Sequence, residues 1–315
     1  MWIGAYFSKP DWHSDYYWWK KFPASDRNPS YSVQKYPEQW KKFVDYTHNQ
    51  INELVSDYGK VDILWLDGGW VRPKTNAEIT TELAEVYENS RWDRNPQSQD
   101  INMPQLVKEV RAKQPKLIVV DRAVPGQQQN YLTPEQHIPE NGLPYPWETC
   151  MTIASQWAWK PNDKMKTLKE SIQTLAATAG GNGNLLYNVG PMMDGRMEER
   201  QIKLLASMGD WLNKNGESVY ATHGGPYKPN AEYATTRKGN KIFIHVLKHN
   251  GNILKMPAIP GVNISKAYFL HGSPALFTHN ENGLLISLPG LLADENDTVI
   301  VLELDKNAEL LPLIE

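Results

Sequence analysis

Short apolar runs alternate with stretches of helical spacing along residues 1–224. An apolar run without alternation is typical of a strand buried on both faces, whereas apolar residues at intervals of three and four indicate an amphipathic helix. Strands are therefore predicted over 2–8, 61–67, 116–121, 147–153 and 184–189, and helices over 40–58, 103–113, 164–179 and 198–213. Only a polar loop is expected between 67 and 103. Strand and helix in this order predict parallel βαβ units, and the fold class is α/β with a (β/α) barrel.

The pattern changes beyond residue 225 to short alternating runs. They cover 241–247, 267–270, 284–288 and 298–304, with turn-rich pieces such as His249-Asn250-Gly251 between them. Alternation of apolar and polar residues is typical of strands with one face in a core, so an antiparallel β-sandwich is predicted. We therefore expect two domains, a (β/α) barrel over 1–224 and a C-terminal β-sandwich over 225–315.

Charge and cysteine content narrow the classes of function. The formal net charge is −3, from 33 Lys and Arg against 36 Asp and Glu, so binding to nucleic acid is not expected. Cys150 is the single cysteine, which excludes an intrachain disulfide framework and a thiolate metal cluster. The chain begins without the features of a signal peptide and has no apolar run long enough to span a membrane, so we expect it to be soluble. The 12 Trp and 15 Tyr suit sugar binding as well as core packing.

Candidate chemistry lies where predicted strands end. In a (β/α) barrel the reacting groups occupy the carboxyl ends of strands, which is where Asp67, Asp121-Arg122 and Asn188 fall. Gly68 and Gly69 follow Asp67 and allow a sharp turn beside its carboxylate. One interpretation is that Asp67 accepts a backbone N–H at the start of the next turn. The other is a glycosidase that retains anomeric configuration, which needs a carboxylate nucleophile and a second carboxyl group about 5 Å away.

A resemblance to a known family favours the second interpretation. Val61-Asp-Ile-Leu-Trp-Leu-Asp-Gly-Gly-Trp70 resembles the nucleophile strand of the α-L-fucosidases of glycoside hydrolase family 29. Further segments match that family in order: Tyr6-Phe7-Ser8, Asp11-Trp12-His13, Val120-Asp121-Arg122, Thr133-Pro134-Glu135, Trp147-Glu148, the run from Gly180 to Pro191, and Asp194-Gly195. The resemblance implies a barrel followed by a sandwich, a fucosylated glycan as substrate, no cofactor and no metal.

The resemblance also implies roles for individual residues. Asp67 corresponds to the nucleophile, and Trp65 faces the same pocket because side chains alternate along a strand. Arg122 is similar to the family's sugar-binding arginine, although a surface salt bridge is the alternative from the residue alone. Trp157 corresponds to an aromatic residue against the apolar face of fucose, or is a core tryptophan. Tyr6 belongs to the matching strand and is expected to bind substrate.

The acid/base is less firmly indicated, because the family takes it from a loop of variable length. Glu135, Glu140 and Glu148 are the candidates. We select Glu135, since Thr-Pro-Glu lies a short loop before Trp147-Glu148 as in several subgroups of the family. Glu148 is the alternative and is otherwise expected to bind substrate. An acid/base needs a raised pKa, from burial or from the like charge of Asp67.

The chain also departs from the family. Its members carry further βα units before the segment that resembles Tyr6-Phe7-Ser8, including a pair of adjacent sugar-binding histidines, whereas Met1 stands just before that segment here. The eight histidines of this chain are scattered, and no metal site is expected. The barrel domain is thus expected to be partial. Either it is a fragment of a longer protein, or self-association or an N-terminal partner completes the barrel.

Other functions stay open at this point. One alternative is a catalytically inactive carbohydrate-binding fragment or relic of the same scaffold. Another is a different retaining barrel glycosidase, such as a galactosidase. Family members are mostly secreted, periplasmic or lysosomal, which leaves localisation unknown for this chain. The resemblance favours an exo-acting retaining α-L-fucosidase, in which Asp67 attacks the sugar and Glu135 donates the proton.

Overall fold

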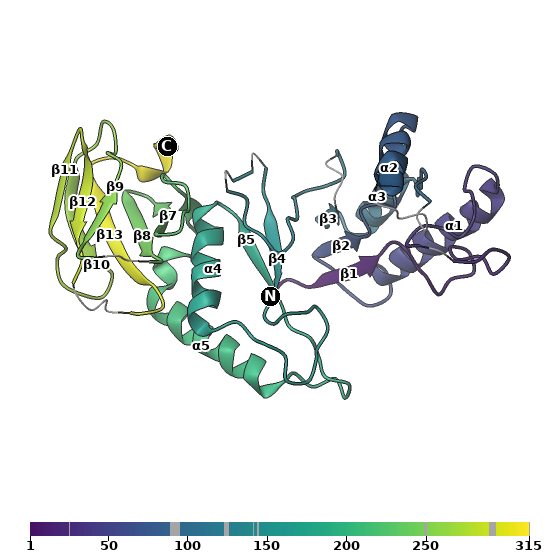
Figure 1. The fold of residues 1–315 in the computed structure, drawn as a ribbon, viewed down its shortest axis with the longest axis horizontal. Coiled ribbons are helices and arrows are strands. Elements are labelled where there is room, and N and C mark those ends of the chain that lie inside the picture. Colours follow the sequence, from purple (N-terminus) through teal and green to yellow (C-terminus); the bar gives the residue numbers. More distant parts are fainter. Residues whose placement is uncertain are drawn as a thin grey trace. The chain divides into compact units, whose positions relative to one another are not determined.

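The computed structural model describes residues 1–24, 26–88, 95–122, 126–140, 142–143, 145–248, 251–289 and 294–314. The chain forms two compact units, Met1–Leu132 and Thr133–Glu315 (Figure 1). The domain boundary predicted at 224/225 lies inside the second unit and stays a prediction. Within the described residues, the helices are all too short or too polar to cross a membrane.

A parallel three-stranded sheet forms the centre of the first unit, as the apolar runs predicted. Its order is β1 (Gly4–Ser8), β2 (Ile63–Asp67) and β3 (Ile118–Asp121). Tyr6 pairs with Trp65 in the register of β1 and β2. Parallel pairing aligns the carboxyl ends of the three strands, so the loops that follow them begin at one edge of the sheet.

Three helices belong to the first unit: α1 (Pro37–Leu54), α2 (Asn76–Glu88) and α3 (Met103–Lys113). Pro37 suits the first turn of α1 because it lacks an N–H that would be unpaired there. The expectation of only a polar loop before α3 was wrong, because α2 lies within it. Most described side chains of α2 are exposed or half-buried, so no strong apolar stripe marked this helix.

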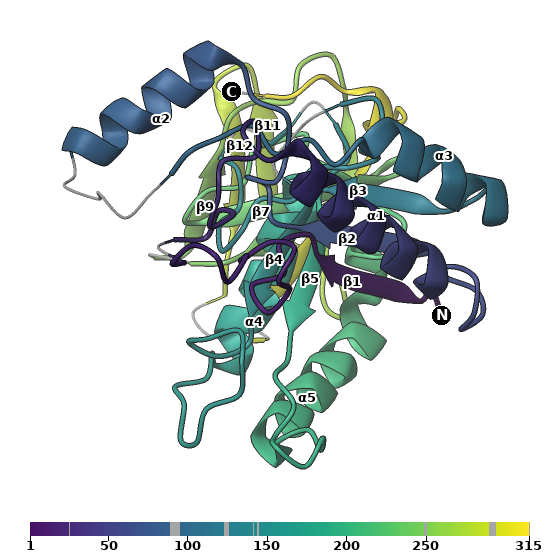
Figure 2. The ribbon, with the colours of Figure 1, turned by 90° about the vertical axis from the view of Figure 1, so that its right-hand side faces the viewer.

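One face of the parallel sheet packs against α1 and α3, which lie next to each other in Figure 2. Leu64 and Leu66 of β2 are fully buried in this core, with Ile51 of α1 and Val110 of α3. Because strand side chains alternate, Trp65 points to the opposite face of the sheet. The second face is therefore the one that presents polar and aromatic side chains.

The second unit begins with a parallel pair of strands, β4 (Glu148–Thr152) and β5 (Asn184–Asn188), followed in the chain by helix α5 (Glu199–Asn215). The connection from β4 to β5 contains α4 (Leu168–Gly180), as the helical spacing predicted. Thr167 accepts a hydrogen bond from the Glu170 N–H and the Glu170 carboxylate accepts from the Thr167 N–H, a capping box that begins α4.

Two antiparallel sheets complete the second unit, in agreement with the predicted sandwich. One has the strand order β10-β13-β8-β7-β6 and the other β11-β12-β9, and they share one apolar core. The strands are β6 (His223–Gly224), β7 (Tyr233–Lys238), β8 (Lys241–Val246), β9 (Ile253–Met256), β10 (Ile264–Phe269), β11 (Phe277–Asn280), β12 (Gly283–Ser287) and β13 (Thr298–Leu304), with 3₁₀ helices at Gly216–Ser218 and Ala308–Leu310. The predicted turn at 249–251 lies mostly outside the described residues.

The outer face of the larger sheet explains why this unit includes residues before 225. Phe243, Val299 and Val301 point away from the sandwich core and pack with Ile172 of α4 and Trp211 of α5. These buried apolar contacts join the helices to the sheet. Residues 133–224 and the sandwich therefore form one compact unit.

Candidate active site

Asp67 ends β2, and three donors surround its carboxylate. The Tyr6 hydroxyl donates to Oδ2 at 2.6 Å, and the Gly68 N–H donates to Oδ1 at 2.7 Å. The Arg122 Nη1 atom lies 3.4 Å from Oδ1. The Asp67 side chain is 27% exposed, so the carboxylate is both held in place and accessible. The interpretation that Asp67 accepts a backbone N–H at the start of the next turn is also correct in part, because the Gly68 N–H is one of the three donors.

The sheet register explains why these side chains meet. Tyr6 pairs with Trp65, and their rings stack with centroids 5.6 Å apart and planes at 22°. Arg122 follows β3, where its N–H donates to the Leu66 carbonyl at 3.1 Å. Its guanidinium carbon lies 5.4 Å from the centroid of the Trp65 ring. Three strands distant in sequence thus bring together four of the predicted site residues.

Gly68 lets the chain turn directly after Asp67. Its φ of +86° lies in the left-handed region, which favours glycine. A Cβ at this position would also lie 2.4 Å from Cδ of Pro10. The glycine therefore brings the loop after β1 close to the backbone that carries Asp67.

A buried ion pair beside Asp67 was not anticipated from the sequence. Lys9 is 1% exposed, and its Nζ contacts Oδ1 of Asp121, which is also buried. The Lys9 backbone N–H donates to the Asp67 carbonyl at 3.1 Å. A buried lysine side chain needs a partner of opposite charge, and here that partner comes from β3. The pair therefore links β1 and β3 on either side of β2.

Tyr6 is held in its protonated form. Although Tyr6 is 63% exposed, partial desolvation of its hydroxyl raises the pKa of Tyr6 above its usual range, and the hydrogen bond to Asp67 and the negative charge of that carboxylate raise it further. The positive charge of Arg122 opposes this shift only in part. Tyr6 therefore stays neutral and donates a hydrogen bond to Asp67.

The acid/base candidates lie in the second unit. Glu135 is exposed and pairs with Cys150 in a single parallel bridge, in which Gln136 N–H donates to the Cys150 carbonyl at 2.9 Å. Glu148 is half-buried at the amino end of β4, and Glu140 is exposed. Glu135 is thus level with the middle of β4, two residues closer to its carboxyl end than Glu148.

Trp157 lies in the connection from β4 to α4. The residue is 40% exposed, so the alternative of a core tryptophan does not hold in this unit. Asn188 Nδ2 donates to the Trp157 carbonyl at 2.8 Å, which ties this loop to the carboxyl end of β5. The loop therefore lies at the edge where the parallel strands of this unit end.

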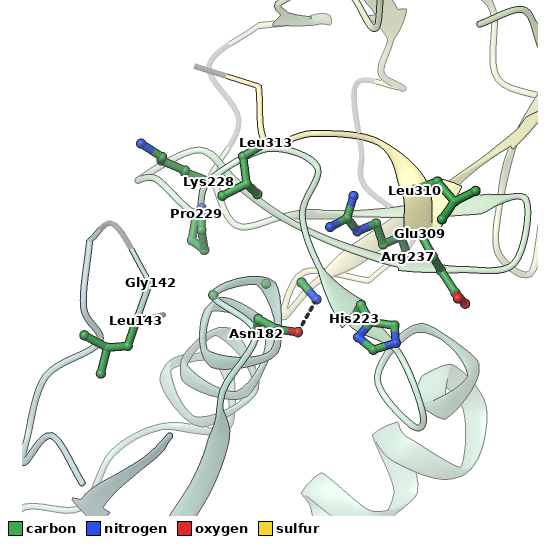
Figure 3. A pocket seen from close by; sticks show the side chains of 13 residues that line it. Gly142, Leu143, Asn182, His223, Lys228, Pro229, Arg237, Glu309, Leu310 and Leu313 are labelled. Carbon is green, nitrogen blue, oxygen red and sulfur yellow. Dashed lines mark hydrogen bonds between the residues drawn. The ribbon is translucent and has the colours of Figure 1, made fainter. Parts of the chain in front are cut away.

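A separate cavity of about 400 Å³ in the second unit contains none of the predicted site residues (Figure 3). Asn182, just before β5, accepts a hydrogen bond from the Gly224 N–H at 2.9 Å in its wall, and His223 and Arg237 also line it.

Among the described residues, no three His, Cys, Asp or Glu side chains are grouped as metal ligands.

Solved glycosidases share this arrangement of parallel βα units and antiparallel sheets. α-L-Fucosidase isoenzyme 1 from Paenibacillus thiaminolyticus superimposes with a TM-score of 0.73 over 96% of this chain and 71% of its own, at 24% identity. The α-fucosidase of Thermotoga maritima in complex with fucose has a TM-score of 0.62 over 83% of this chain and 56% of its own, at 25% identity.

The sequence comparison identifies the family. The profile described as Alpha-L-fucosidase matches residues 1–217, and the chain therefore belongs to the α-L-fucosidase family. Plasma α-L-fucosidase of Pongo abelii is 28% identical over 307 residues, which cover 92% of this chain and 58% of that relative. The chain thus spans little more than half the length of this curated relative.

Proposed function

We propose that this chain acts as an exo-acting, retaining α-L-fucosidase that removes terminal α-L-fucosyl residues from glycans. The observation that carries the proposal is the Asp67 carboxylate, accessible at the end of a parallel strand and oriented by Tyr6, Gly68 and Arg122. The proposed fold is a (β/α) barrel to which β1–β3, β4 and β5 belong. In such a barrel the carboxyl ends of the strands carry the reacting groups.

In the first step, an Asp67 carboxylate oxygen attacks the anomeric carbon of fucose. The bond from that carbon to the glycosidic oxygen breaks, and Glu135 gives its proton to the departing oxygen. The aglycone leaves as an alcohol, and an ester links fucose to Asp67. Arg122 and Tyr6 keep the carboxylate in the orientation for attack, so less ordering is needed on the way to the transition state.

In the second step, Glu135 takes a proton from water as the water oxygen attacks the same carbon. The ester bond to Asp67 breaks, which releases fucose and restores both carboxyl groups to their starting states. Two inversions give net retention. Trp65 would form a wall of the fucose pocket, and Trp157 would pack against the apolar face of the sugar.

Strand position supports Glu135 rather than Glu148 as the acid/base. Glu148 begins β4 and pairs with Asn184 at the beginning of β5, whereas the reacting groups of a barrel lie at the opposite edge. One strand residue rises about 3.3 Å, so Glu148 lies roughly 13 Å along the strand from Thr152 at that edge. The proposed contact of Glu148 with substrate consequently needs its own test.

Hydrolysis of 4-nitrophenyl α-L-fucoside tests the proposal. We expect Asp67→Gly to abolish turnover and azide to restore it, because the small anion takes the place of the missing carboxylate. A single displacement by azide gives the β-fucosyl azide. The matched control is Asp57→Gly, an exposed aspartate in the turn after α1, which should retain wild-type activity.

Absence of turnover from the folded wild-type chain would contradict the proposal for this chain alone. It would favour the inactive carbohydrate-binding alternative, provided that fucose still binds. If activity appears only when a separate N-terminal polypeptide is added, a completed barrel is required. Sedimentation velocity distinguishes that case from activity that depends on self-association.

A further inference from the structure

The loop after β1 presents an exposed ring, Trp12, beside an aromatic cluster to which the neighbouring Trp18 belongs. Most rings of that loop pack against one another or against α1, as Tyr17 does with Phe43. Trp12, by contrast, is 49% exposed, and its ring stacks on half-buried Trp18 with centroids 5.7 Å apart and planes at 16°. The pair lines a cavity of about 250 Å³ with Ala24, Asp26 and Arg27.

Hydrogen bonds hold both rings in place. The Trp12 indole N–H donates to the Arg27 carbonyl at 3.2 Å, and the Trp18 indole N–H donates to the Asn28 carbonyl at 3.0 Å. Exposed aromatic rings with satisfied polar atoms form a rigid apolar surface that loses little conformational entropy on binding. This arrangement suits the flat apolar face of a pyranose ring.

The same cavity offers polar groups. Arg27 stacks over the Trp70 ring at 4.4 Å, and its guanidinium makes no hydrogen bond or ion pair with other described residues. Three N–H donors orient the Asp26 carboxylate: the Asn28 backbone N–H donates at 2.8 Å, the Asn28 side-chain amide at 2.7 Å and the Asn95 backbone N–H at 2.7 Å. A guanidinium and a carboxylate can donate to and accept from neighbouring sugar hydroxyls.

Contacts attach this cavity to the loop of Asp67. The Arg27 carbonyl also accepts a hydrogen bond from the Trp70 indole N–H at 3.2 Å, and Trp70 lies three residues after Asp67. Both loops start at the carboxyl ends of paired strands, β1 and β2. The cavity and the carboxylate therefore belong to one edge of one sheet.

We infer that the cavity lined by Trp12, Trp18, Asp26 and Arg27 binds the pyranose residue to which the fucose is attached. Trp12 stacks on the apolar face of that sugar, and Arg27 and Asp26 bind its hydroxyls. This subsite would make an oligosaccharide a better substrate than an aryl fucoside. The role of this subsite in catalysis rests on the proposed function. Binding of the saccharide to the cavity does not depend on it.

Relative kcat/KM for two substrates tests the subsite. We expect the ratio of kcat/KM for a fucosylated lactose trisaccharide to that for 4-nitrophenyl α-L-fucoside to fall about two- to tenfold in Trp12→Ala, because an aromatic stack contributes about 0.5–1.5 kcal/mol. Arg27→Met should lower the same ratio. Trp2→Ala is the matched control, since Trp2 is exposed before β1 and outside the cavity. An unchanged ratio in Trp12→Ala would overturn the inference.

A binding experiment separates failure of the subsite from failure of the proposed function. Saturation-transfer NMR with lactose requires no turnover. We expect signals from the lactose ring protons with the wild-type chain and with Trp2→Ala, and their loss with Trp12→Ala. If the chain hydrolyses neither substrate, this result alone decides the inference, and equal signals from all three proteins would refute it.

Discussion

The two units hold their candidate catalytic residues in different ways. Asp67 lies at the end of a central strand, with Tyr6 and Arg122 brought to it by paired neighbours. Glu135 lies in a segment joined to β4 by one bridge, and Trp157 lies in a loop. A nucleophile must be oriented accurately toward one carbon, whereas an acid/base serves different leaving groups. We infer that the paired strands of the first unit orient the nucleophile accurately. The loops of the second unit let the acid/base serve different leaving groups.

Beyond Asp67 itself, replacement of Glu135, the proposed acid/base, should have the largest effect. We expect Glu135→Ala to reduce kcat for an alkyl fucoside by about 10³-fold, because general acid catalysis typically contributes 10²–10⁴-fold. A 2,4-dinitrophenyl fucoside needs little protonation, so its first step should be nearly unaffected. Azide should then give the α-fucosyl azide, the opposite anomer to that from Asp67→Gly. Glu148→Ala is the comparison variant. A larger loss of kcat in Glu148→Ala than in Glu135→Ala would mean that Glu148, and not Glu135, is the acid/base.

Loss of the buried cation should destabilise the first unit. Lys9→Met leaves Asp121 buried without its partner, which typically costs about 3–5 kcal/mol. Urea unfolding gives the free energy, and segment-resolved hydrogen exchange shows whether the loss is confined to residues 1–132. Lys42→Met, on the exposed side of α1, should change neither measurement. Adding Asp121→Leu to Lys9→Met should recover stability, and failure to do so would mean that the ion pair is not the cause.

The second unit contains a comparable buried pair with a weaker expected effect. His245 Nδ1 lies 2.6 Å from Asp297 Oδ2, and His245 Nε2 lies 3.3 Å from the Ser218 carbonyl, with both side chains of the pair fully buried. We expect His245→Ala to cost about 3 kcal/mol, since Asp297 loses its partner. Faster hydrogen exchange should appear in β8 and β13. The exposed His271→Ala variant should have no effect. If His245→Ala also accelerated exchange in the first unit, the two units would not be stabilised independently of each other.

The smallest expected effect is removal of the Tyr6 hydroxyl. Tyr6→Phe should lower kcat/KM roughly fivefold, because a hydrogen bond contributes about 1 kcal/mol. Tyr58→Phe removes a similar exposed tyrosine–carboxylate contact outside the site and should have no effect. An unchanged rate in Tyr6→Phe would mean that Arg122 and the Gly68 N–H suffice to orient Asp67.

The pH dependence of Tyr6 gives a second measurement. Its folded-state pKa is raised above the ordinary value of 10.0, by burial and by Asp67. The stabilising contribution of the neutral hydroxyl is therefore fully present below pH 10 and is lost as the pH rises through the folded pKa. The difference between ultraviolet titrations of wild type and Tyr6→Phe should place this tyrosine above pH 10. A midpoint at or below 10 would contradict the hydrogen bond to Asp67.

Much of the local structure could be predicted from the pattern of apolar residues. The ranges of α3 and β13 agree with the predicted 103–113 and 298–304, and β1, β2 and β5 lie within their predicted runs. Periodicity failed for α2, whose side chains are mostly exposed, because a helix without a strong apolar stripe lacks that signal. The predicted barrel and its domain boundary concern contacts between distant segments, and both stay predictions.

The sequence by itself determined which residues stand at strand ends and which share a strand face. Alternation along β2 placed Trp65 with Asp67, and Gly68 indicated a sharp turn. Only the tertiary structure decided that Tyr6 and Arg122 donate to Asp67, that Lys9 pairs with Asp121, and that α4 and α5 pack on the outer face of the larger sheet. The physical reason is range: alternation and turns depend on neighbouring residues, whereas strand register and packing depend on contacts between residues far apart in the chain.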